Sequence, residues 1–383
     1  MSVTAARGFR AAGVAAGVRS GTGPDVALVV NDGPLDAAAG VLTSNRVKAA
    51  PVRWTQQVLT TGRLTAVVLN AGGANACTGS AGFADTHATA EAVAAALGIG
   101  AIDVAVCSTG LIGERLPLEA VLSGVDKAAA ALSGAGGDAA ARAILTTDTV
   151  AKTATVSRDG WTVGGMAKGA GMLAPGLATM LCVLTTDAAV PSADCDAALR
   201  AATARTFDRV DSDGCMSTND TVLLLASGAS AASPARSDFA AAVEQVCADL
   251  CRQLLADAEG STKDVTVEVV GAASETDAVE VGRAVARSNL LKCALFGNDP
   301  NWGRVLAAVG TTSADFEPDA LDVAINAVQV CRAGGAGEPR DRVDLSGRAV
   351  HILVDLHAGS ETAAVWTNDL SLAYVHENSA YST

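Results

Sequence analysis

The amino-acid sequence predicts an α/β fold in which mixed sheets are layered with helices. Apolar, strand-like runs alternate with helical segments along the whole chain. Asp159-Gly160 is a strong hairpin signal, so some neighbouring strands are antiparallel. Hydrophobic residues make up 50% of the chain but aromatic residues only 3%, so we expect a core of Ala, Val and Leu.

The first half of the chain provides three short buried strands and three helices. We expect strands at 26–30, 65–70 and 103–110, and helices at 84–97, 118–132 and 138–145. Asp85 and Thr86 are plausible caps for the first of these helices. A hairpin follows at 152–167 and turns at Asp159-Gly160.

The second half continues the alternation of strands and helices. Its strands are expected at 179–186, 221–227, 263–272, 351–356 and 362–367, and its helices at 196–206, 237–258 and 276–289. The helix at 237–258 is the clearest, because apolar side chains recur at intervals of three and four residues along one face. Residues 333–342 are the segment most expected to be flexible.

Length and charge limit the classes of function. A chain of 383 residues can form two or three domains or one two-lobed unit. The net charge of −14 argues against nucleic acid and against an anionic membrane surface as partners. No segment approaches the roughly 18 apolar residues of a membrane helix, and the N-terminal segment lacks the apolar centre of a signal peptide, so we expect a cytoplasmic protein.

The cysteines and histidines give no metal site. Nine cysteines occur without a Cys-x-x-Cys pair, and we expect Cys77, Cys107, Cys182 and Cys293 to be reduced core thiols. Cys247 and Cys251 lie four apart on the expected helix, but no histidine joins them. The Gly-x-Ser-x-Gly, Walker A, Gly-x-Gly-x-x-Gly and His-Glu-x-x-His signatures are all absent. An enzyme built from this chain needs a nucleophile that does not depend on histidine.

The segment KGAGMLAPGLATML, at 168–181, offers such a nucleophile. If the bond between Ala178 and Thr179 were cut, Thr179 would carry both a hydroxyl nucleophile and, in its new amino group, a base. The glycines and Pro175 before it permit backbone conformations that could strain this bond. Taken alone, the segment is better explained as a glycine-rich turn that enters a buried strand, because most clusters of glycine and proline mark turns.

Eight motifs together resemble the glutamate N-acetyltransferase/ornithine acetyltransferase family of arginine biosynthesis. They are AGGANACTG, CSTGLIGERLP, TTDT, KGAGMLAPGLATML, STNDTV, DAEG, GNDPNWGR and the tail YVHENSAYST. The resemblance covers nearly the whole chain, and it implies self-cleavage at Ala178-Thr179. Residues 1–178 would then form an α chain and residues 179–383 a β chain, paired as α2β2. The α chain carries a net charge of +1 and the β chain −15.

The resemblance also implies the chemistry and the residues that perform it. An acetyl group would pass from N-acetylornithine to glutamate through an acetyl-Thr179 intermediate in a ping-pong scheme, without a cofactor, and bifunctional members also accept acetyl-CoA. Thr109 and Gly110 would form the oxyanion hole, whose donors are each worth about 10² to 10³ in rate. The implied substrate contacts are Thr146, Lys168, Thr179, Glu259, Asn378 and Thr383.

Two other functions remain open on the sequence. One is a self-cleaving threonine aminopeptidase or amidase, in which water replaces glutamate as acceptor. The other is an uncleaved amino-acid-binding protein. The implied site residues also have simpler explanations: Thr109-Gly110 as a turn that ends a strand, Lys168 as an exposed lysine, and Glu259 as an acid at a helix end.

Overall fold

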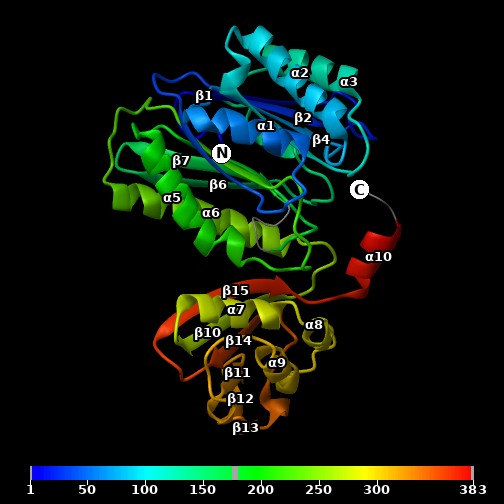
Figure 1. Cartoon of the computed structure of the whole chain (residues 1–383), viewed down its shortest axis with the longest axis vertical. Helices are drawn as coiled ribbons and strands as arrows, with labels where there is room; N and C mark the ends of the chain where they lie inside the picture. Colours follow the sequence, from blue (N-terminus) through cyan, green and yellow to red (C-terminus); the bar gives the residue numbers. More distant parts are fainter. Residues whose placement is uncertain (1, 175–179, 381–383) are drawn as a thin grey trace.

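The computed structural model describes residues 2–174 and 180–380, and these contain three β-sheets with helices packed around them (Figure 1). The expected residues Ala178, Thr179 and Thr383 lie outside the described ranges. The α/β class with mixed sheets is confirmed, because parallel and antiparallel pairs occur within each sheet.

Two of the sheets form the upper body of the molecule in Figure 1. Sheet A has, in spatial order, β1 (Phe9–Val14), β2 (Val26–Asn31), β4 (Ala66–Ala71) and β5 (Val104–Thr109). Sheet B has β3 (Ala37–Leu42), β9 (Thr221–Ala226), β8 (Leu181–Thr186), β7 (Trp161–Lys168) and β6 (Lys152–Arg158).

Sheets A and B stack on each other and are covered by helices on their outer faces. Successive side chains of a strand point to opposite faces, so β8 contributes to two cores. Leu181 and Val183 share a core with sheet A, while Cys182 and Leu184 pack with α5 and α6. The helices of this body are α1 (Ala50–Val58), α2 (Gly79–Leu97), α3 (Leu118–Ala130), α4 (Gly137–Ala143), α5 (Ser192–Arg205) and α6 (Arg236–Ala256).

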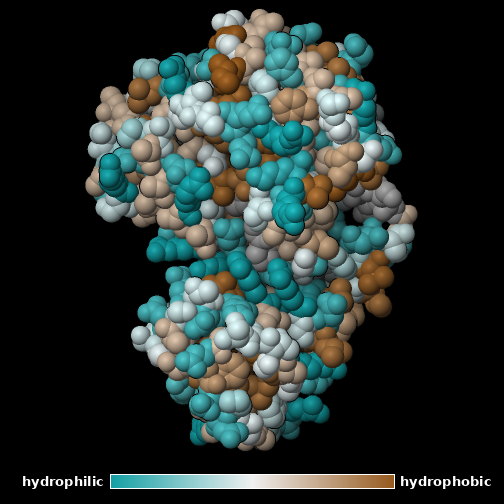
Figure 2. Space-filling view, viewed as in Figure 1, coloured by the Kyte–Doolittle hydropathy of each residue, from teal (hydrophilic) through white to brown (hydrophobic). Residues whose placement is uncertain are grey.

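Sheet C forms a separate lower lobe with its own hydrophobic core (Figure 1). Its strands are β13 (Gly335–Ala336), β12 (Val328–Arg332), β11 (Asp322–Ile325), β14 (Ala349–Asp355), β10 (Asp264–Ala272) and β15 (Glu361–Asn368). Its helices are α7 (Glu275–Ala286), α8 (Asn289–Phe296) and α9 (Trp302–Val309). Hydrophilic residues border the notch between the lobe and the upper body (Figure 2). After β15, α10 (Leu372–Ala380) runs back towards the upper body (Figure 1).

Most of the expected helices and strands are present, but one helix start and the exposure of two cysteines differ from expectation. The helix expected at 84–97 begins at Gly79, so Asp85 and Thr86 are not caps but lie inside α2. There Asp85 pairs with Arg115, and the Thr86 hydroxyl donates to the Gly82 carbonyl. Cys107 and Cys182 are core thiols as expected, whereas Cys77 and Cys293 are exposed.

The described ranges contain neither a candidate membrane span nor a candidate metal cluster. None of the helices in residues 2–174 and 180–380 combines the length and the hydropathy that a membrane span needs. Within the same ranges, no group of three or more His, Cys, Asp or Glu side chains could hold a metal ion.

Candidate active site

The site begins where strands of two different sheets end. Thr109 is the last residue of β5 and Lys168 the last residue of β7. The Lys168 Nζ donates to the Thr109 Oγ1 at 3.2 Å, and the Lys168 side chain is only 3% exposed. An ammonium group can only donate, so Thr109 must accept here, and its own O–H stays available to donate to another atom.

Gly110 follows Thr109 in a conformation that requires glycine. Its φ is +131°, and a Cβ at this position would lie 2.5 Å from the backbone nitrogen of Gly73. The Thr109 carbonyl is fixed in the same turn, because it accepts from the Gly72 N–H at 2.9 Å. Thr109-Gly110 therefore is a turn that ends a strand, as the simpler explanation of the sequence expects. The same turn also presents a hydroxyl group that can donate a hydrogen bond.

Asp148 holds the neighbourhood of Lys168 in place. Its carboxylate accepts from the N–H groups of Gly169 at 2.6 Å and Thr146 at 3.0 Å. It also accepts from Lys152 Nζ at 2.6 Å and lies 3.9 Å from Lys168 Nζ. Burial raises the pKa of Asp148, but Lys168, Lys152 and the Gly169 N–H together outweigh burial and lower it to about 2. Burial lowers the pKa of Lys168, and Asp148 opposes that shift.

Lys152 joins two parts of the chain that the predicted cleavage would separate. Its side chain is fully buried, and its ammonium group pairs with Asp148 and with Asp257, the residue after α6. Thr149 also donates to Asp257, through its N–H at 3.0 Å and through its hydroxyl. Buried charges of this kind persist only when they are paired and hydrogen-bonded, as they are here.

Glu259 lies at the other end of the site and has three partners. Its N–H donates to the Ala170 carbonyl at 2.9 Å. One carboxylate oxygen accepts from the Thr147 hydroxyl at 2.7 Å, and the other accepts from the Asn378 amide at 2.9 Å. A pocket of about 420 Å³ opens beside these groups. Its lining also includes Thr149, Asp257 and Glu377.

The C-terminal helix α10 reaches the site because Gly260 lets it approach closely. Gly260 has a φ of +62°, and a Cβ there would lie 2.2 Å from the Tyr374 nitrogen. The Ser371 hydroxyl donates to the Gly260 carbonyl at 2.5 Å and accepts from the Tyr374 N–H at 3.0 Å. A role for the tail requires it to dock into the site, and Asn378 does so.

The structure describes six of the expected residues, Thr109, Gly110, Thr146, Lys168, Glu259 and Asn378, and brings others to them. Gly110 and Thr146 take part through their backbone, Thr146 through its N–H to Asp148. Lys168 is buried, which excludes its interpretation as an exposed lysine. Sequence reasoning assigned no role to Thr147, Asp148, Lys152 and Asp257. Three of these lie in the motifs TTDT and DAEG, which were a signal for them.

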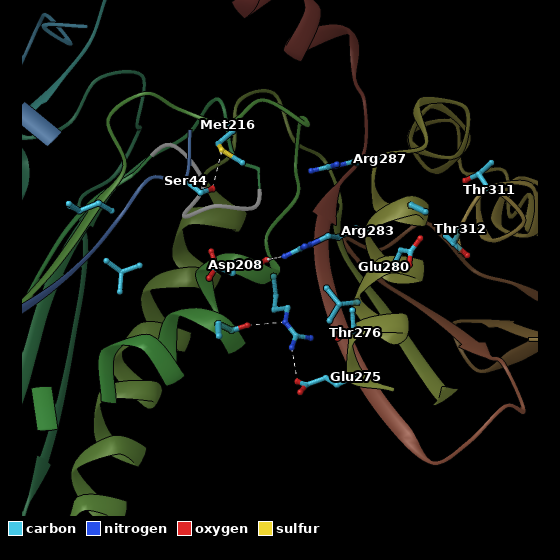
Figure 3. Close-up of a pocket in the computed structure, with 16 residues that line it drawn as sticks. Ser44, Asp208, Met216, Glu275, Thr276, Glu280, Arg283, Arg287, Thr311 and Thr312 are labelled. Atoms are coloured by element: carbon cyan, nitrogen blue, oxygen red, sulfur yellow. Dashed lines mark hydrogen bonds and ion pairs between the residues drawn. The ribbon is translucent and has the colours of Figure 1, made fainter. Parts of the chain in front are cut away.

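A second, larger pocket lies elsewhere, between sheet B and α7 of the lower lobe. Its volume is about 970 Å³. Arg283 and Arg287 extend from α7 towards the upper body, and Arg283 contacts Asp208 (Figure 3). Each of these arginines already has a partner, since Arg287 pairs with Asp211. Of the expected site residues within 2–174 and 180–380, none lines this pocket, so we place the active site at Lys168 and Glu259.

Known proteins are similar to this chain over its whole length. Residues 10–383 match the model of the ArgJ family. The "Arginine biosynthesis bifunctional protein ArgJ" of Streptomyces avermitilis is 68% identical over 383 residues, and that of Streptomyces coelicolor is 67% identical, with full coverage of both chains in each case.

Among solved structures, the chain is similar to an ornithine acetyltransferase from Mycobacterium tuberculosis, solved in complex with ornithine. The two are 64% identical, the match covers 47% of this chain and 96% of the other, and the TM-score is 0.45. The family expected from the eight motifs is confirmed by the family model and the curated relatives. The chain belongs to the ArgJ family.

Proposed function

We propose that this protein is an ornithine acetyltransferase that moves an acetyl group from N-acetylornithine to glutamate through an acetyl ester on Thr179. The observation that carries the proposal is the hydrogen bond between Lys168 and Thr109. Glu259 is held beside them, because its N–H donates to the Ala170 carbonyl, and Asn378 donates to the Glu259 carboxylate. The names of the relatives, which refer to arginine biosynthesis and ornithine acetyltransferase, support it.

The charges of the site suit this donor substrate. N-acetylornithine carries a carboxylate and a side-chain ammonium group. The Glu259 carboxylate, at the edge of the 420 Å³ pocket, can accept from the ammonium, and the Lys168 ammonium can donate to the carboxylate. We infer that Thr146 and Thr383 also contact the substrate, as in the family that the motifs resemble.

The acyl transfer needs a base and a stabiliser for the oxyanion. The Thr179 amino group takes the hydroxyl proton as Oγ bonds to the acetyl carbon, and it gives this proton to the departing ornithine nitrogen. The glutamate amine then attacks the ester, and the proton that it loses returns to Oγ. In both steps the Thr109 hydroxyl and the Gly110 N–H would donate to the oxyanion.

The nucleophile requires a cut before Thr179, which divides the protein into residues 1–178 and 179–383. Sheet B would then contain strands of both pieces, because β8 pairs with β7 on one side and with β9 on the other. The two pieces would stay together as α and β chains, and we propose an α2β2 assembly. We further propose that the enzyme works in the cytoplasm without a cofactor, with acetyl-CoA as a second donor.

Intact mass spectrometry tests the proposal. Purified protein should give two fragments, the second beginning at Thr179, and incubation with N-acetylornithine should add one acetyl group to that fragment. The Thr179→Ala variant should remain one chain and transfer nothing. Release of acetate without transfer to glutamate would favour the amidase instead. An uncleaved wild type that binds ornithine without turnover would favour a binding protein.

A further inference from the structure

Asn219 is a buried asparagine that the proposed function does not use. It lies in the motif STNDTV, two residues before β9, and is 6% exposed. Its side-chain amide donates to the Ala74 carbonyl at 2.6 Å and to the Ser108 carbonyl at 2.9 Å. A carbonyl oxygen can only accept, so the nitrogen of the amide must face these two groups. The amide oxygen accepts from the Thr218 hydroxyl at 2.6 Å.

Both carbonyls belong to segments that surround the Thr109-Gly110 turn. Ser108 immediately precedes the turn at the end of β5. Ala74 lies in the segment after β4, in which the Gly72 N–H donates to the Thr109 carbonyl at 2.9 Å. One side-chain amide therefore holds the two segments on which the position of the turn depends.

Bonds within sheet A do not fix the turn relative to sheet B. Asn70, in β4, accepts from the Ser108 hydroxyl at 2.6 Å and donates to the Gly73 carbonyl at 3.2 Å. These bonds join the two segments to each other, and both segments follow strands of sheet A. Asn219 differs from Asn70 because it precedes β9, a strand of sheet B.

The segment that carries Asn219 also holds the residue before β8. The Asp220 carboxyl accepts from the Met180 N–H at 3.0 Å, and the Thr221 N–H donates to the Met180 carbonyl at 3.1 Å. The Ser217 hydroxyl hydrogen-bonds to the Asp220 carboxyl and accepts from the Asn219 N–H at 3.0 Å. One short segment is thus bonded to the turn at the end of β5 and to the strand that follows the proposed cut.

We propose that Asn219 is a positioning residue for acyl transfer, whose amide fixes the Thr109-Gly110 turn against sheet B, the sheet that carries Lys168. This inference rests on the proposed function. Donors to an oxyanion contribute most when they are held in place before the charge develops. A misplacement of about 1 Å can lower a rate about 10²-fold. In the cleaved protein the amide would belong to the β chain and both carbonyls to the α chain.

The variant Asn219→Ala tests this inference, because it removes both donors and introduces no charge. The turn would act on the oxyanion and not on the bound substrates. The kcat should therefore fall about 10- to 100-fold, whereas the KM values for N-acetylornithine and glutamate should change less than about 3-fold. The kcat is counted per cleaved molecule, with the cleaved fraction read from an SDS gel, so that slower self-cleavage cannot imitate the effect.

Combination with Thr109→Val shows whether Asn219 acts through the turn. Thr109→Val already removes one donor to the oxyanion, which leaves less for the amide to position. Asn219→Ala should therefore lower kcat by a smaller factor in the Thr109→Val protein than in the wild type. Equal factors in the two backgrounds would mean that the amide acts independently of Thr109, and this would overturn the inference.

Asn368→Ala is the matched control. The Asn368 amide is also buried, and it donates to the carbonyls of Leu255 at 3.1 Å and Lys263 at 3.0 Å. These carbonyls belong to α6 and to the segment before β10. Asn368→Ala should destabilise the protein without lowering kcat. If it lowered kcat as much as Asn219→Ala does, the loss of any buried amide would explain the result and the inference would be wrong.

If Asn219→Ala does not fold, Thr218→Val answers the question, because it removes only the bond that orients the amide. A fall in kcat of about 2- to 10-fold, as expected for one hydrogen bond, with unchanged KM values would support the inference. A kcat equal to that of the wild type would contradict it. A wild type that transfers no acetyl group would instead refute the proposed function, and the inference with it.

Discussion

Replacing Lys152 by methionine should destabilise the protein far more than the loss of an ordinary ion pair. Methionine keeps most of the volume and removes the charge, which leaves two carboxylates, of Asp148 and Asp257, without their common partner. These side chains are 0% and 8% exposed, and the lysine itself is 0% exposed. Breaking a buried pair by removing one partner costs about 3–5 kcal/mol.

This free energy can be converted into a melting temperature. The entropy of unfolding is about 2.1 cal/mol/K per residue, which for 383 residues gives roughly 0.8 kcal/mol/K if the chain unfolds in one transition. We therefore expect Lys152→Met to lower the Tm by about 4 to 6 °C in differential scanning calorimetry.

Arg200→Met is the control for this measurement. Arg200 pairs with Asp196 at the surface, where both side chains are largely exposed, at 61% and 45%. Such a pair contributes at most about 1 kcal/mol, so the Tm should change by about 1 °C or less. If Lys152→Met lowered the Tm no more than Arg200→Met does, the buried ion cluster would not have the stabilising role derived from its geometry.

Three further predictions concern the site. Thr109→Val should lower kcat about 10²- to 10³-fold, because it removes a donor to the oxyanion. Glu259→Gln should raise the KM for N-acetylornithine about 10- to 100-fold, because a hydrogen bond to a charged group contributes about 1.5–3 kcal/mol. The same variant should not raise the KM for glutamate, because glutamate has no side-chain ammonium group. The pKa of Asp148 is lowered to about 2. The stability that its carboxylate provides is therefore present above about pH 3.9 and is lost as the pH falls towards 2. In Asp148→Asn the Tm should fall less steeply over that pH range.

Each of these predictions has an outcome that contradicts it. The buried Thr185 donates to the Val3 carbonyl, away from the site, and Thr185→Val serves as the control for Thr109→Val. Equal kcat values for the two variants would exclude Thr109 as a donor to the oxyanion. A rise of both KM values in Glu259→Gln would argue against recognition of the ammonium group. An acid transition with the same shape in Asp148→Asn and wild type would show that other groups determine it.

Most strands of the fold could be predicted because their signal is local, but β1, β3, β11, β12 and β13 were not expected. The run at 181–186 begins with four apolar residues and is buried throughout, as expected of a strand covered on both faces, and it forms the middle of sheet B. The start of α2 could not be predicted, because no side chain caps it and its first turn contains two glycines. Asp85, which looks like a cap in the sequence, is instead buried by its pairing with Arg115.

The site was predictable only through its motifs. Asp148 lies four residues from Lys152, but the second carboxylate that encloses the ammonium group, Asp257, lies 105 residues away, so the local sequence does not indicate a buried cation. Likewise, Asn378 meets Glu259 across 119 residues because α10 packs against Gly260. Pairings at such separations depend on how the layers assemble, and neither periodicity nor composition contains that information.

The position of β8 inside sheet B also determines how long a cleaved molecule lasts. A strand with backbone partners on both sides can leave only when the sheet itself opens, so parting of the two pieces and global unfolding are the same event. Dilution should then not separate them on any experimental timescale shorter than the unfolding half-life. The unfolding rate, rather than a dissociation constant, therefore determines how long the two fragments stay together. Fragments that are synthesised separately and then added should not exchange with the fragments of an intact enzyme.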